Sequence, residues 1–192
     1  MEYTTESSNL QIVKMKDDNE NGGWGAAIKR SLMPSQFYVI EKKPEIASSF
    51  YFSLVEPTTV FTLTKSAPIF LLELLLLRVE PLDEELSKKK RRERAQMGGF
   101  NVDDLCMQIN VLENRPMWID DSEFQSVTEL CEKCRRMKEE RHIQFVVIDD
   151  FLHIPIPQSV REGMEAPDAV NKQLCQLAKE LDIVVVALLE DE

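Results

Sequence analysis

Long apolar runs are scarce in this sequence of 192 residues, and so are signals for export. The most apolar run, from Ile69 to Leu77, is shorter than the roughly 20 residues that a helix needs to cross a bilayer, and Glu73 interrupts it. The first ten residues contain no basic segment followed by an apolar one, so we expect no signal peptide. We therefore expect a soluble, cytoplasmic protein with no membrane partner.

Cysteine is also rare, with four residues in the chain. Without an export signal we expect reduced thiols and no disulfide framework. Cys131 and Cys134 have the spacing of a zinc-binding pair, but the sequence has no second Cys/His pair at the spacing of a zinc ribbon. They also fall inside an expected helix, so we interpret the spacing as unrelated to metal binding.

Basic residues are fewer than acidic ones: the chain has 23 Lys and Arg and 34 Asp and Glu, which gives a formal net charge of −11. An acidic protein repels nucleic-acid phosphates at long range, which argues against tight non-specific binding. The one dense basic run, from Lys88 to Arg94, could contact phosphates. We favour a solvated, charged segment there, and keep nucleic acid only as a weak candidate partner.

The second half of the chain has the alternating pattern of an α/β protein. A short strand is expected at Arg115–Asp121, followed by a helix that Ser126 and Glu129 can cap and that ends near Arg141. A nearly continuous apolar run, Ile143–Ile148, is typical of a central strand in a parallel sheet. A helix over Ala169–Leu181 and a strand over Ile183–Leu189 complete the pattern.

The first half is less regular. Leu10–Met15 and Ser49–Leu54 are predicted as strands, and two or three helices are expected between Pro68 and Glu113. The Ile69–Leu77 stripe is expected to be part of a buried helix, with an interface as the alternative. No repeat or low-complexity linker divides the chain, so we predict one domain over residues 1–192.

Several segments resemble the motor domain of the bacterial replicative DNA helicase (DnaB-type), in the order that this family has them. They are Trp118–Asp121 (WIDD), Thr128–Leu130 (TEL), Cys134–Lys138 (CRRMK), Phe145–Asp149 (FVVID) and Leu177–Leu181 (LAKEL). The resemblance is specific from about residue 115 to 190. It implies a three-layer, RecA-like P-loop NTPase fold with a mainly parallel sheet and an association with DNA replication.

In the family, the residue at Asp149 is the Walker B aspartate, which orders magnesium. The resemblance therefore implies a vestigial magnesium site at Asp149, with Asp150 as a weaker candidate. The phosphate loop GxxxxGK[ST] is absent. Its nearest counterpart is the segment with Gly22, Gly23 and Gly25. The two residues after Gly25 are alanines, in place of the motif's lysine and hydroxyl residue, and Lys29 lies three residues after the first alanine. If the strands that end in Asp120-Asp121 and Asp149-Asp150 are neighbours, four carboxylates could also gather around a divalent cation.

Two further departures concern catalytic positions that the resemblance implies. The family's catalytic glutamate ends a strand with the pattern FSLE; here we align Phe52–Val55, which leaves Glu56 one residue late as a weak candidate. The family's glutamine after the last strand becomes Glu190, a second weak candidate.

We therefore expect a non-catalytic, pseudo-ATPase module that binds protein partners or self-associates through helicase-like subunit surfaces. We expect it to hold no cofactor. The alternative is a subunit that binds ATP or ADP with magnesium and hydrolyses it only within a helicase-type oligomer.

Overall fold

The computed structural model describes residues 2–6, 10–14, 30–42, 44–79, 102–124, 126–155 and 166–190. The glycines at 22, 23 and 25, Lys29 and the basic run 88–94 lie outside these residues. The interpretations placed on them in the sequence stay predictions.

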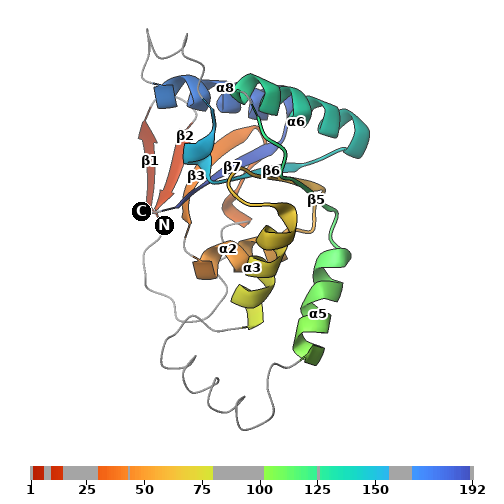
Figure 1. The fold of residues 1–192 in the computed structure, drawn as a ribbon. Coiled ribbons are helices and arrows are strands. Elements are labelled where there is room, and N and C mark those ends of the chain that lie inside the picture. The colour runs from red at the N-terminus through yellow and green to blue at the C-terminus, as the bar shows by residue number, and fades with distance from the viewer. Residues whose placement is uncertain are drawn as a thin grey trace.

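One sheet of seven strands organises the described residues (Figure 1). The strands are β1 (Glu2–Glu6), β2 (Leu10–Lys14), β3 (Gln36–Lys42), β4 (Thr58–Thr62), β5 (Met117–Asp120), β6 (Phe145–Asp149) and β7 (Val184–Glu190). Their order across the sheet is β1-β2-β3-β7-β6-β4-β5. Only the β1–β2 pair is antiparallel; the other five pairs are parallel, as the sequence predicted.

Helices cover both faces of the sheet and make three layers (Figure 1). On one face lie α2 (Pro44–Ser53), α3 (Ala67–Val79) and α5 (Val102–Glu113), and on the other lie α6 (Val127–Arg141) and α8 (Ala166–Leu181). A short 3-10 helix, η1 (Phe151–His153), follows β6. The predicted three-layer α/β architecture is confirmed.

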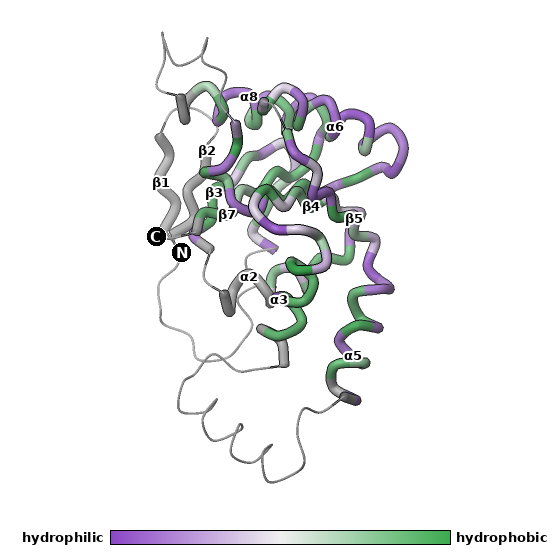
Figure 2. The backbone as a smooth tube through the Cα atoms, viewed as in Figure 1, coloured by the Kyte–Doolittle hydropathy of each residue, from purple (hydrophilic) through white to green (hydrophobic). Residues whose placement is uncertain are grey.

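The central strands are buried on both faces because each layer of helices packs against its own set of strand side chains. Along β6, Phe145 and Val147 join the core under α2 and α3, whereas Val146 and Ile148 join the core under α6 and α8. All five β6 residues are buried, and burial on both faces explains why the first four, Phe145–Ile148, are an unbroken apolar run. Figure 2 shows these hydrophobic strands between helices that are more hydrophilic on the α6 and α8 side.

The predicted start of the helix after β5 is confirmed in detail. Ser126 is the N-cap of α6, and its side chain accepts a hydrogen bond from the Glu129 backbone N–H at 3.3 Å. The helix ends at Arg141, and its C-cap is His142, whose backbone is left-handed with φ 54°. Cys131 and Cys134 are both buried in α6.

The predicted strand over Ser49–Leu54 is wrong, because these residues lie in and just after α2. Phe50, Tyr51 and Leu54 are buried together against the sheet, a spacing that suits one side of a helix. The aromatic residues favour strands in general, but tertiary packing overrides that preference here. The strands β3 and β4 were not predicted from the sequence at all.

The apolar stripe Ile69–Leu77 lies in α3 and is only partly buried. Phe70 and Leu74 are buried in the core, whereas Ile69, Leu72 and Leu76 are exposed. In the described part of the chain, no helix is long and apolar enough to cross a membrane.

Candidate functional site at the carboxyl edge of the sheet

The carboxyl ends of β3, β7 and β6 lie side by side. The chain segments that follow β3 and β6 lead to helices on opposite faces of the sheet. After β3 the chain enters α2 on one face, and after β6 it continues toward α8 on the other. Such a switch point is where open α/β sheets bind ligands. Asp149 ends β6, and Glu190 ends β7 opposite Lys42 of β3 in the ladder. Two of the residues singled out in the sequence therefore lie at this edge.

Asp149 is directed into the protein, where it meets a tyrosine from α2. The Tyr51 hydroxyl donates a hydrogen bond to Asp149 Oδ2 at 3.0 Å. Asp149 is 4% exposed and Tyr51 is fully buried. Burial, and then the nearby Asp149 carboxylate, raise the pKa of Tyr51 well above its ordinary value, so the phenol stays a neutral donor.

Asp150 begins the turn after β6 in a left-handed conformation, with φ 73° and ψ 76°. Its Oδ2 lies 2.7 Å from His153 Nδ1, which forms an ion pair when the imidazole is protonated. Asp149 and Asp150 thus face different neighbours, although they are adjacent in sequence.

The four carboxylates at the ends of β5 and β6 do not form one cluster, because β4 lies between these strands. Asp121 Oδ2 instead accepts a hydrogen bond from the Ala67 backbone N–H at 2.8 Å and so caps α3. Within the described ranges, no group of three or more His, Cys, Asp or Glu side chains is arranged to hold a metal ion.

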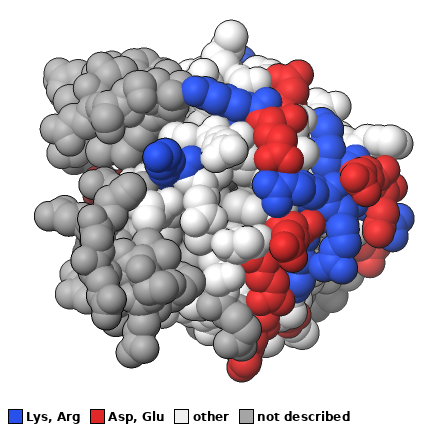
Figure 3. Space-filling view, turned by 90° about the horizontal axis from the view of Figure 1, so that it is seen from above, with Lys and Arg blue, Asp and Glu red and all other residues white. Residues whose placement is uncertain are grey.

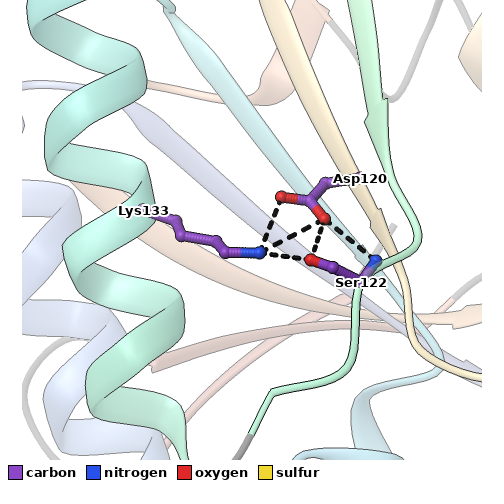
Figure 4. Close-up of polar contacts among 3 residues, drawn as sticks. All are labelled: Asp120, Ser122 and Lys133. Carbon is purple, nitrogen blue, oxygen red and sulfur yellow. Dashed lines mark hydrogen bonds and ion pairs between the residues drawn. The ribbon is translucent and has the colours of Figure 1, made fainter.

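Asp120 forms a compact polar cluster with Ser122 and Lys133 (Figure 4). Lys133 Nζ lies 3.1 Å from Asp120 Oδ2 and also donates to the Ser122 hydroxyl. Ser122 in turn donates to Asp120 through its hydroxyl and its backbone N–H. The Lys133 ammonium also lies 4.4 Å from the centre of the Phe124 ring. The cluster therefore fastens the end of β5 to α6.

Glu56 lies at the opposite edge of the sheet from Asp149. It precedes β4, whose first residue, Thr58, is paired with Phe145, whereas the last, Thr62, is paired with Asp149. The Glu56 carboxylate accepts a hydrogen bond from the Val55 backbone N–H at 3.2 Å. Sequence reasoning placed Glu56 near the site because it took part of α2 for a strand.

The junction between β3 and α2 is the strand-to-helix turn of this switch point. A phosphate loop needs such a position, where a glycine-rich turn leads into a helix N-terminus. From Glu41 to Ser53, however, the chain contains no glycine, and its two lysines, Lys42 and Lys43, precede the helix. Sequence reasoning missed this junction because it had not recognised β3.

The outer face of α6 and α8 carries mixed charge. Figure 3 looks onto this side of the molecule and shows basic and acidic side chains interspersed. One pair joins the two helices: Arg135 Nε lies 2.7 Å from Glu180 Oε1. Interspersed charges of both signs do not make the continuous basic surface that a phosphate backbone requires.

The three layers and the strand order define an α/β domain of the RecA-like class. A solved ATPase domain shares this fold over 96% of the chain, with 19% identity, a TM-score of 0.65 and 65% of that domain covered. A solved DnaB-like replicative helicase, described with its interactions with primase, matches 95% of the chain at 19% identity and a TM-score of 0.63, with 44% of its own length covered.

The chain belongs to the family of DnaB-like helicase C-terminal domains, whose sequence model matches residues 32–190. It is 24% identical over 162 residues to the replicative DNA helicase DnaB of Buchnera aphidicola subsp. Baizongia pistaciae (strain Bp), which covers 82% of this chain and 35% of that helicase. Over 81 residues it is 37% identical to DnaB of Rhodothermus marinus, covering 40% of this chain and 8% of that one. The chain thus spans about a third, or less, of the length of these relatives.

Proposed function

We propose that this chain is a DnaB-like, helicase-related module that does not hydrolyse nucleotide and acts through protein contacts in DNA replication. The observation that carries the proposal is the turn from β3 into α2. Backbone N–H groups can wrap a phosphate closely only where glycines permit the tight turn, and a lysine must reach the β and γ oxygens. The residues Lys42–Ser49 supply neither the glycines nor a lysine inside the helix.

The end of β4 supports the same proposal. This strand lies beside β6, and its last two residues begin the segment Phe61-Thr62-Leu63-Thr64, a pattern close to the FSLE of the resemblance. Thr64 then stands where a catalytic glutamate is expected. A threonine hydroxyl is a poor base, so it cannot activate an attacking water as a carboxylate does.

Protein contacts are a function that does not require phosphoryl transfer. The solved DnaB-like helicase is described with its interactions with primase. A chain that keeps the fold but lacks the hydrolytic groups can still present a surface to a second copy of itself or to another replication protein. Self-association or a protein partner is therefore part of the proposal, and nucleic acid is a weaker candidate.

The alternative is a subunit that binds ATP with magnesium within an oligomer. One observation favours it: Asp149, which the resemblance aligns with the family's Walker B aspartate, ends β6. ATP hydrolysis decides between the two. We expect the wild-type protein to release no more phosphate from ATP and magnesium than Asp149→Asn does, at protein concentrations high enough for self-association. Phosphate release that rises with protein concentration and disappears in Asp149→Asn would favour the alternative.

A further inference from the structure

The resemblance implies a magnesium ion beside Asp149, but the surroundings of this carboxylate do not fit one. Magnesium keeps several water ligands and demands nearly octahedral geometry, so its protein ligand must reach a hydrated space. Asp149 is 4% exposed, and its Oδ2 already accepts the Tyr51 hydroxyl at 3.0 Å. A hydroxyl hydrogen directed at this oxygen repels a cation that approaches the same lone pair.

We propose that Asp149 is a structural acceptor for Tyr51 and not a metal ligand, so that the phenol has taken the place of the hydrated cation. The inference deepens the proposed function by assigning a new role to the one carboxylate that the chain keeps at this position. It ties α2 to β6, two elements that are 98 residues apart in the sequence at this contact.

The packing around Tyr51 holds the phenol in this position. Phe70 of α3 meets the Tyr51 ring edge-on, with ring centroids 5.1 Å apart and an interplanar angle of 87°. The Asp149 backbone is fixed as well, because its carbonyl accepts a hydrogen bond from the Leu63 backbone N–H at 3.1 Å. Neither partner can turn away to admit a hydrated cation without disturbing the core.

The thermal stability of the Tyr51→Phe variant tests the hydrogen bond between Tyr51 and Asp149. This change removes one oxygen and leaves the buried Asp149 carboxylate without its phenol donor. We expect the melting temperature to fall by roughly 3–10 °C, because the buried carboxylate loses a hydrogen bond that partly offsets its desolvation. Tyr38→Phe is the matched control: this phenol is also buried, but its oxygen accepts a hydrogen bond from a neutral backbone group, the Met33 N–H, at 2.9 Å. A smaller loss is expected there.

The pair can be separated from general core damage by combining the variants. In the Asp149→Asn variant, the side chain that faces residue 51 is a neutral amide and not a carboxylate. We therefore expect Tyr51→Phe to lower the melting temperature less in this variant than in the wild-type protein. Equal losses in both backgrounds, or a Tyr51→Phe protein as stable as wild type, would overturn the inference.

Manganese provides a readout that needs no variant to fold. Mn²⁺ binds carboxylates as magnesium does and broadens the NMR signals of nearby nuclei. We expect the amide signals of Asp149 and Thr62 in the wild-type protein to broaden no more than those of strand residues at the opposite edge. Selective broadening at Asp149 would overturn the inference even if the protein hydrolysed no ATP. Hydrolysis without such broadening would overturn only the proposed function.

Discussion

Replacing Lys133 with methionine tests the cluster that fastens β5 to α6. Methionine keeps the apolar stem but removes the ammonium that contacts Asp120 at 3.1 Å and the Phe124 ring at 4.4 Å. The side chains of Lys133 and Asp120 are 18% and 31% exposed, so the pair is screened less than a surface pair. We expect a loss of about 1–2 kcal/mol, of which the ring contact contributes about 0.5–1 kcal/mol.

Urea unfolding at neutral pH measures this loss, and Lys172→Met on the exposed face of α8 is the control. The control is expected to change the free energy of unfolding by less than about 0.5 kcal/mol. If Lys133→Met were as stable as wild type, or lost no more than the control, the assignment of stability to this cluster would be refuted.

The pH dependence gives the same prediction a second test. Burial alone would raise the pKa of Asp120, but hydrogen bonds from Ser122 and the contact with Lys133 outweigh it and lower that pKa below its ordinary value. A lowered pKa means that the stabilisation is present above the unfolded-state pKa of about 3.9 and is lost as the pH falls through the folded pKa. The difference between wild type and Lys133→Met should therefore narrow below about pH 4. A difference that stayed constant into acid would contradict this account.

Two further predictions concern α6 and the thiols. Ser126→Ala removes the N-cap acceptor for Glu129 N–H and should lower the free energy of unfolding by about 1 kcal/mol in urea titrations, whereas Ser126→Asp should restore it. A thiol reagent should label the exposed Cys106 quickly, and Cys131 and Cys134 only after unfolding. Burial raises the pKa of the Cys131 thiol to about 11. The contribution of this protonated thiol to the free energy of unfolding is therefore complete below the unfolded-state pKa of about 8.5, and it is lost as the pH rises from there through 11. Rapid labelling of all thiols in the native protein would contradict the buried placement.

The strands and helices after residue 115 could be predicted from the sequence because local pattern and tertiary environment agree there. Strand β6 is buried on both faces and therefore reads as a continuous apolar run. The cap of α6 is local, since Ser126 and Glu129 are three residues apart. In the first half of the chain the prediction was wrong where local pattern and tertiary environment disagree. The aromatic segment around Phe50 and Tyr51 favours a strand by its local pattern, but in the folded protein it is a helix buried in the core.

The candidate site was predictable only in part. A carboxylate at the end of a buried strand can be placed from the sequence, and Asp149 lies where it was expected. Its partner cannot be found in this way, because Tyr51 is distant in the sequence and belongs to a helix that had been taken for a strand. The separation of Asp120 from Asp149 likewise depends on the strand order, in which β4 intervenes. No local signal reports that order.

The most direct test of the central claim is a thermal-shift titration of the wild-type protein with ATP and ADP, with and without magnesium. A nucleotide that binds the folded state raises the melting temperature with its concentration. We expect no shift at millimolar nucleotide, with or without magnesium, because the turn from β3 into α2 lacks the groups that hold phosphates and Asp149 is bound to Tyr51. A dose-dependent rise that requires magnesium and is lost in Asp149→Asn would contradict the account and identify a working nucleotide site.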